Sequence, residues 1–211
     1  MTTLNLNGFN AEYLIKDDEL NILAPMIEQW IKINREYIEE EKYEDALYLY
    51  NERSTVGSLA GAAWKCGGYA IEEYVAIKGK DKDEKNGRID LLLNLSRKNI
   101  IIEAKQLWLQ LYNQSQNDIK EKIKQSLTSA TNDIKKTISS NDYGDFNIGV
   151  TFITPYWKGD VNKSINIESI REIICQLDTS IFIIFEPKEK VIHIDGDNYK
   201  MCIALFKKIN S

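Results

Sequence analysis

Residues 87–106 read GRIDLLLNLSRKNIIIEAKQ, two strongly apolar runs that nevertheless carry Asp90, Glu103 and Lys105. Runs of this length, separated by the polar SRKN, are typical of two strands joined as a hairpin. Carboxylates and an ammonium in such a hairpin have two readings. They lie on its solvated face, or they form a site that holds a ligand.

The pairing of the two strands decides where these charges lie. If SRKN is a four-residue loop, Leu95 faces Ile100 and, further along, Asp90 faces Lys105. Opposed residues share a face and side chains alternate between faces, so one face is wholly apolar. It holds Ile89, Leu91, Leu93, Leu95, Ile100, Ile102 and Ala104. The other face gathers Asp90, Glu103 and Lys105, and burial of the apolar face opposes a one-residue slip.

Three charged groups on one face suit a metal site. The carboxylates of Asp90 and Glu103 repel each other unless a cation lies between them, and Mg²⁺ needs few protein ligands and keeps several waters. We therefore expect Mg²⁺, with Mn²⁺ as a substitute, and a metal-bound water as nucleophile. Lys105 would orient that water or offset charge on the phosphorus.

The flanking sequence predicts alternating helices and strands. Helices are expected over 19–50, 44–65 and 113–138, and strands over 69–78, 88–95, 99–108 and 146–157, with a polar loop at 79–87. Gly57 and Gly61 leave one side of the second helix flat, so another backbone could approach it there. The order of elements across 44–157 indicates a mixed α/β arrangement. Further on we expect a helix at 166–177, strands at 180–187 and 191–195, and a short closing segment at 199–208.

Asp90, a run of isoleucines and then Glu103-Ala104-Lys105 resemble the motif of the PD-(D/E)xK nuclease superfamily. That superfamily has the restriction-endonuclease-like fold, in which a helix, three antiparallel strands, a helix and a further strand form the core. The resemblance covers about residues 44–157 and implies an α/β fold with a central mixed sheet flanked by helices. The whole chain, 1–211, then reads as a single domain. An acidic helical extension at 1–43 would precede the core, and an αββ extension at 158–211 would follow it.

The resemblance also assigns roles to individual residues. Asp90 and Glu103 look like the metal ligands, with the Ala104 carbonyl as a backbone ligand, and Lys105 looks like the catalytic lysine. Many members add a glutamate from the first core helix, for which Glu52 is the best candidate and Glu44 the next. Gln106 resembles a position that helps to arrange the site. Two features depart from the family pattern: Ile89 stands where proline is common, and the following helix lacks a QxxxY pattern, which argues against the RecB-like branch.

The distribution of charge along the chain indicates where phosphate could be contacted. The net charge of −5 is uneven, because residues 1–50 hold eleven acidic and four basic residues. A weakly positive remainder can still carry a basic face for phosphate. The candidate contacts are Gln106, Lys120 and Lys124, with Arg97 and Lys98 in the hairpin loop. Each of them is also an ordinary choice for a solvated surface.

The sequence gives little support for a zinc protein, for catalysis that uses a histidine and a nucleophile, or for a membrane protein. The three cysteines have no zinc-like spacing and are read as reduced core residues, and His193 has no nucleophile motif to serve, so a structural or surface role is expected. No signal peptide or membrane-spanning stretch is evident, so a cytoplasmic protein without a membrane partner is expected.

The sequence therefore predicts a Mg²⁺-dependent nuclease that hydrolyses phosphodiester bonds in nucleic acid, with DNA as the favoured substrate. A homodimer would allow cuts on both strands. The alternative is a catalytically silent module of the same fold that binds nucleic acid or a protein partner. An RNA-cutting activity would use the same residues and is not separable from the sequence.

Overall fold

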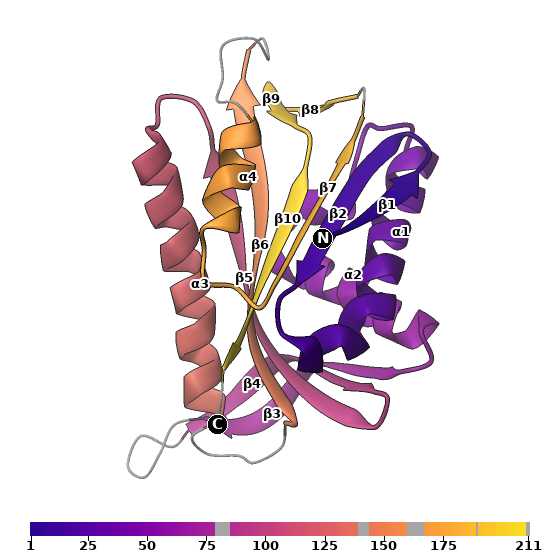
Figure 1. Cartoon of the computed structure of the whole chain (residues 1–211), viewed down its shortest axis with the longest axis vertical. Coiled ribbons are helices and arrows are strands. Elements are labelled where there is room, and N and C mark those ends of the chain that lie inside the picture. The colour runs from indigo at the N-terminus through magenta and orange to yellow at the C-terminus, as the bar shows by residue number, and fades with distance from the viewer. Residues whose placement is uncertain (79–84, 139–143, 160–166, 189, 210–211) are drawn as a thin grey trace.

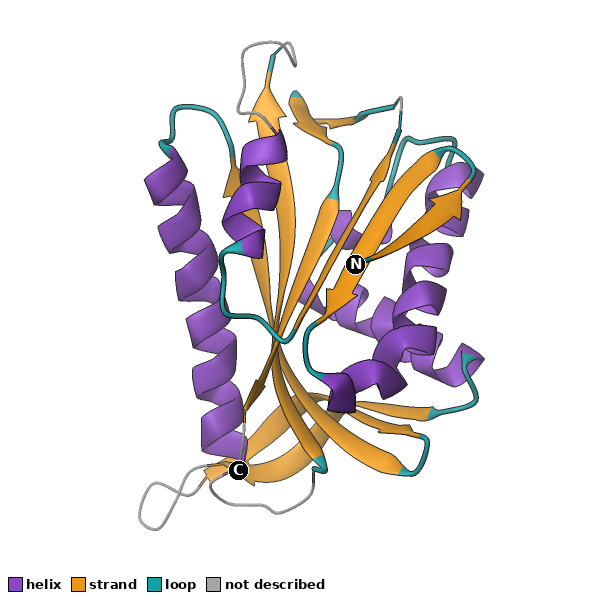
Figure 2. Ribbon diagram, viewed as in Figure 1, coloured by secondary structure: helices purple, strands orange, loops and turns teal. Residues whose placement is uncertain are grey.

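The computed structural model describes residues 1–78, 85–138, 144–159, 167–188 and 190–209. A ten-stranded mixed sheet forms its centre, with helices on both faces (Figures 1 and 2). The first half contains β1 (Thr2–Leu6), β2 (Phe9–Ile15), a 3-10 helix (Asp18–Leu23), α1 (Ala24–Glu40), a 3-10 turn (Leu47–Leu49), α2 (Glu52–Lys65) and β3 (Tyr69–Lys78). It continues with β4 (Lys85–Leu95), β5 (Lys98–Gln110), α3 (Gln116–Ile138) and β6 (Phe146–Lys158). The last elements are α4 (Ile167–Cys175), β7 (Ile181–Pro187), β8 (Ile192–Ile194), β9 (Asp197–Tyr199) and β10 (Cys202–Ile209).

The strands lie in the order β1-β2-β7-β10-β6-β5-β4-β3, with β8 and β9 attached beside β6. The β5–β6 pair is parallel, and the other pairs are antiparallel. Residues of α1 and α2 pack on one face of the sheet, where Trp30 and Leu59 are fully buried. Residues of α3 and α4 pack on the other face through Ile123 and Ile174. Because both faces are covered, the central strands read as nearly continuous apolar runs.

The expected order of elements across 44–157 is confirmed, since α2, β3, β4, β5, α3 and β6 follow one another. The expected start of the second helix at 44 is wrong. Its first residue is Glu52, and Asn51 caps it by accepting a hydrogen bond from the Ser54 N–H at 2.9 Å. Asparagine at this position satisfies an amide that the first turn leaves without an intrahelical partner. The helix expected over 19–50 is likewise shorter, running from Ala24 to Glu40.

Several elements were not foreseen. The acidic segment before residue 44 begins with the β1–β2 hairpin, and β2 pairs with β7 in the common sheet. The expected short closing segment is β10, which lies between β6 and β7. In the expected loop at 79–87, residues 79–84 fall outside the described residues, and Gly87 pairs with Ala76 within β4 rather than forming a turn.

The close backbone approach predicted at Gly57 and Gly61 occurs elsewhere. A Cβ at Gly61 would meet nothing within 4 Å, and one at Gly57 would meet only the Glu72 side chain. A Cβ at Gly149 in β6 would instead lie 2.8 Å from the Thr131 backbone nitrogen of α3. Glycine at 149 therefore allows α3 to pack directly on the strand beside the Glu103 position, to which Gly149 is paired.

The remaining expectations have mixed outcomes. Cys202 is buried as expected, but Cys66 and Cys175 are exposed rather than part of the core. His193 is exposed on β8, in agreement with a surface role. No helix in the described part of the chain is long and apolar enough to cross a membrane.

Candidate functional site

The hairpin that carries the motif closes more tightly than expected. Leu95 pairs with Lys98 instead of Ile100, and Ser96 and Arg97 form a two-residue turn with φ values of 50° and 64°. Positive φ at both central positions matches the right-handed twist of paired strands. The shift moves each partner by two residues, so the two sets of side chains keep their expected faces.

The apolar face is confirmed with one exception. Leu91, Leu93, Leu95, Ile100, Ile102 and Ala104 are all buried in the core that includes α1 and α2. Ile89 instead packs with Ala76, Ile101 and Ile134, in a cluster to which α3 contributes. The alternation thus breaks between Leu91 and Ile89, and Asp90 lies at the break.

At Asp90 the two strands of the hairpin separate. The β4–β5 ladder ends at the Leu91–Ile102 pair, and the β3–β4 ladder skips Asp90, opposite which Glu73 has a φ of 54°. Beyond this point β5 lacks β4 as a partner, so its amides on that side need other acceptors. We call this opening between β4 and β5 the fork.

Two carboxylates supply the missing acceptors. Asp90 Oδ2 accepts a hydrogen bond from the Ala104 N–H at 2.7 Å, and Glu52 Oε2 accepts one from the Gln106 N–H at 3.0 Å. Glu52 reaches the fork because it is the first residue of α2, where its negative charge also suits the helix dipole. The N–H and C=O of one strand residue point to the same side, so the Ala104 carbonyl opens into the fork as well.

Glu103 is the most deeply buried charged group at the fork. Its side chain is 3% exposed, and its Oε1 accepts hydrogen bonds from Lys78 Nζ at 2.5 Å and Thr137 Oγ1 at 2.7 Å. Burial raises the pKa of Glu103, the bonds from Lys78 and Thr137 oppose that rise, and nearby Asp90 adds to it. The net direction is upward because removing a carboxylate from water disfavours its charged form.

Lys105 lies on the same side of β5 as Glu103 and pairs with α3. Its Nζ is 3.0 Å from Asp133 Oδ2. Burial by itself would lower the pKa of Lys105, but Asp133, Glu52 and Asp90 outweigh it and the pKa is raised. Asp133 also contacts Lys136 at 3.0 Å, and the two lysines hold its pKa low against the effect of burial.

Glu52 is the helix glutamate at the fork, and Glu44 is not. Glu44 is exposed in the turn before the second 3-10 segment and lies outside α2. Burial raises the pKa of Glu52, Lys105 lowers it, and Asp90 raises it further, for a net rise. A cleft of about 30 Å³ beside the fork is lined by Glu52, Arg53, Val56, Glu72, Glu73 and Asp90.

The Gln106 side chain forms hydrogen bonds inside the protein and does not point into solvent. Its Nε2 donates to Thr154 Oγ1 of β6 at 2.9 Å, and its Oε1 accepts from Thr55 Oγ1 of α2 at 3.5 Å. The side chain therefore ties α2 to β6 behind the fork. The side chain is half-buried, and the role of Gln106 in arranging the site stays a prediction.

The lysines and arginine predicted to contact phosphate do not gather at the fork. Lys120 donates to Gln176 at 3.1 Å and Lys124 pairs with Glu121, about 20 Å and 14 Å along α3 from Asp133 at 1.5 Å per residue. Arg97 is exposed at the hairpin turn, and Lys98 pairs with Asp145 at 2.8 Å.

Three residues at the fork were missed by the sequence reading: Lys78, Asp133 and Thr137. Asp133 and Thr137 are four apart, so they share one face of α3, and that spacing was visible in the sequence. Nothing local indicates that this face lies over Glu103 and Lys105, because the docking of α3 is set by its buried apolar residues and by Gly149.

The donor set at the fork is small. Among the described residues, no group of three or more His, Cys, Asp or Glu side chains is placed to hold a metal ion. Within the described part of the chain, the hydrogen bonds to these two carboxylates use Oδ2 of Asp90 and Oε1 of Glu103, so Oδ1 and Oε2 are their remaining oxygens. With the Ala104 carbonyl they make three oxygen donors, which suits Mg²⁺, since that ion keeps several waters.

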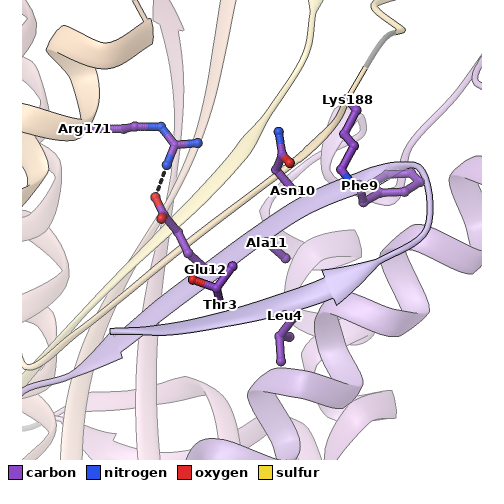
Figure 3. A pocket seen from close by; sticks show the side chains of 8 residues that line it. All are labelled: Thr3, Leu4, Phe9, Asn10, Ala11, Glu12, Arg171 and Lys188. Carbon is purple, nitrogen blue, oxygen red and sulfur yellow. Dashed lines mark hydrogen bonds and ion pairs between the residues drawn. The ribbon is translucent and has the colours of Figure 1, made fainter.

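A separate hollow lies at the other edge of the sheet. It has a volume of about 240 Å³ and is lined by Thr3, Leu4, Phe9, Asn10, Ala11, Glu12, Arg171 and Lys188 (Figure 3). Arg171 of α4 points to Glu12 of β2 and pairs with it. None of the residues singled out in the sequence lines this hollow.

Comparison of the chain with protein-family models, with curated proteins and with solved structures finds no match.

Proposed function

We propose that this protein is a Mg²⁺-dependent nuclease of the PD-(D/E)xK type that hydrolyses phosphodiester bonds in DNA. The observation that carries the proposal is the meeting of Asp90, Glu103, Lys105 and Glu52 at a point where two strands separate. The two carboxylates that replace missing strand partners are held by regular structure, Asp90 by β4 and Glu52 by the first turn of α2. Such rigid placement favours a binding or catalytic site over a solvated hairpin face.

The surrounding fold supports the proposal. A helix, three antiparallel strands, a helix and a strand parallel to the third match the order of the restriction-endonuclease-like core. The motif lies in the second and third of these strands, and Glu52 begins the first helix. The β1–β2, β7 and β10 strands would then be additions to this core on the far side of β6.

Each residue has a task in this proposal. When bound, a divalent cation supplies Lewis acidity and lowers the pKa of a bound water. Asp90 accepts the Ala104 N–H through Oδ2, so its Oδ1 would be the oxygen that holds the ion, together with Oε2 of Glu103 and the Ala104 carbonyl. Lys105 is held by Asp133 and stays charged, so it can offset negative charge that develops on the phosphate.

Two arginines beside the cleft are better placed for phosphate than the residues first considered. Arg53 follows Glu52 on α2, and Arg88 lies two residues before Asp90 on β4. Both are well exposed and hold Glu73, at 2.9 Å and 3.2 Å. Cations at the mouth of an acidic site would guide the nucleic-acid backbone toward it.

The test is cleavage of plasmid DNA, single-stranded DNA and RNA with Mg²⁺ or Mn²⁺ by the purified full chain. Asp90→Asn and Lys105→Met should each lower the rate by at least about 100-fold. Lys32→Met, which removes an exposed lysine of α1, should leave the rate unchanged. Equal cleavage by D90N and the parent, with both folded, would refute the assignment.

The second candidate is a silent module that binds nucleic acid or a protein partner. It is favoured by the Lys78 ammonium on Glu103, which already neutralises a carboxylate that a metal would need. DNA binding without cleavage, unchanged by D90N and by removal of divalent ions, would favour this candidate over the nuclease.

A further inference from the structure

Lys78 occupies an unusual place for a lysine. It is the last residue of β3, and its side chain is only 18% exposed. The ammonium lies 2.5 Å from Glu103 Oε1, the oxygen that also accepts from Thr137 at 2.7 Å. Both donors therefore meet the same oxygen of Glu103, Oε1.

Lys78 packs the methylene groups of its side chain against the neighbouring strand β4. Its Cδ and Cγ lie over Gly87 of β4, where an added Cβ would be 2.8 Å and 3.0 Å from them. Any residue larger than glycine at 87 would push the stem away. Glycine here is not required by backbone conformation, because its φ is not among the positive values. Glycine is needed at 87 because the Lys78 side chain passes directly over this position.

This contact has an electrostatic consequence for the fork. A buried carboxylate needs a compensating charge, and the Lys78 ammonium supplies one without any bound ion. A divalent cation between Asp90 and Glu103 would lie close to that ammonium, and like charges at such distances oppose each other. The lysine stem has four rotatable bonds, so the ammonium can leave Glu103 without movement of the strand.

We propose that Lys78 is an internal counter-ion that competes with the divalent cation for Glu103 and so sets the metal concentration at which the site fills. This inference rests on the proposed nuclease function and adds a regulatory residue to it. Without a divalent ion, Lys78 and Thr137 keep Glu103 paired and in position. When the ion binds, Lys78 turns away from Glu103 toward the solvent or toward a bound phosphate.

The test follows thermal unfolding of the full chain during Mn²⁺ titration, a measurement that needs no catalytic activity. Lys78→Met removes the competing charge, and Gly87→Ala displaces the lysine but keeps its charge. Both variants should be less stable than the parent without metal, and both should reach half of their metal-induced shift at about tenfold lower Mn²⁺. Lys32→Met, which breaks an exposed lysine–glutamate pair at 3.9 Å, and Gly61→Ala are the matched controls.

The outcomes separate the inference from the function on which it rests. If the parent responds to Mn²⁺ and neither K78M nor G87A responds at lower concentration, the competition is refuted while the metal site stands. If K78M and G87A respond and the parent does not, Lys78 blocks the site outright and the inference holds. If none of the three responds, the metal site and the inference both fail. Should K78M not fold, G87A decides alone.

Discussion

Glu52 is a residue of the fork whose charged carboxylate lowers the stability of the fold. Its carboxylate is half-buried, and burial raises its pKa more than Lys105 lowers it. A carboxyl whose folded pKa is raised stabilises the fold below its unfolded pKa and loses that contribution as pH rises through the folded value. At neutral pH, therefore, the ionised Glu52 weakens the fold.

Glu52→Gln should consequently raise the urea midpoint of unfolding at pH 7, because the amide is neutral and its oxygen can still accept from the Gln106 N–H. The gain should disappear near pH 3, where Glu52 itself is protonated. Equilibrium unfolding at the two pH values measures the difference. Glu36→Gln on the exposed surface of α1 is the control, and a gain for E52Q that persists at pH 3 would contradict the explanation.

Asp133 should control the protonation of Lys105 from across the interface with α3. Its hydrogen bond and charge are the main causes that raise the pKa of Lys105 against burial, so Asp133→Asn should lower that pKa. Lysines react with acylating reagents in their neutral form, and Lys105 should be labelled severalfold faster in D133N at pH 9. Peptide mass spectrometry measures the rate, and Asp118→Asn on the same helix is the control. An unchanged labelling rate would show that Asp133 does not set the charge of Lys105.

The residues at the fork divide into those that a sequence can reveal and those that it cannot. Asp90, Glu103 and Lys105 lie within one hairpin. Strand alternation places Glu103 and Lys105 on one face of β5, and Asp90 joins them where β4 separates from β5. Lys78, Thr137 and Asp133 come from a third strand and a helix, and their contacts depend on how α3 docks. The two-residue error in register did not matter, because a shift of two preserves the face of each side chain.

At the scale of elements, the docking of α3 on β6 depends on glycine at position 149, which has no side chain. Gly149→Ala would place a Cβ 2.8 Å from the Thr131 nitrogen, and backbone cannot rotate away as a side chain can. We expect a loss of about 1–3 kcal/mol of folding free energy and an outward shift of α3, with Asp133 and Thr137 carried along.

Gly61→Ala is the matched substitution in α2, where an added Cβ meets nothing within 4 Å. It should stabilise the protein by about 1 kcal/mol through helix propensity. Denaturant unfolding of the two variants measures both effects. Equal stabilities of the two variants would contradict the close packing of α3 on β6 at Gly149.

The turn that closes the motif hairpin is strained by its residues. Ser96 and Arg97 both have positive φ, a conformation that L-residues adopt at a cost and glycine adopts readily. Arg97→Gly should therefore raise the free energy of unfolding by about 0.5–1 kcal/mol, seen as a higher denaturant midpoint at unchanged slope. Lys98→Gly, one residue further and within β5, should lower it. A destabilised R97G would indicate that the register of the hairpin differs from the one described.

At the scale of the whole molecule, the sheet joins parts of the chain that the sequence pattern separates. Local alternation predicted the strands of the core because each carries its own apolar run between polar connections. Local alternation did not predict the position of β10 between β6 and β7. The neighbours of a strand are decided by long-range pairing and not by its own residues. The β1–β2 hairpin was not predicted, although TTLNL and FNAEYLI alternate between apolar and polar residues.

The position of β10 makes the last residues of the chain essential to the fold. It pairs with β6 through seven residue pairs and with β7 through five, and Cys202, Ile203, Ala204, Leu205 and Phe206 are fully buried. A chain that ends at residue 200 would leave edges of β6 and β7 unpaired and expose both hydrophobic cores. We expect such a chain to lose cooperative thermal unfolding and native amide dispersion. Deletion of residues 2–6 removes only the edge strand β1, so it should lower the melting temperature and keep a cooperative transition. If the chain that ends at residue 200 still unfolds cooperatively, α2 to β6 form an independent domain and the sheet is two units joined side by side.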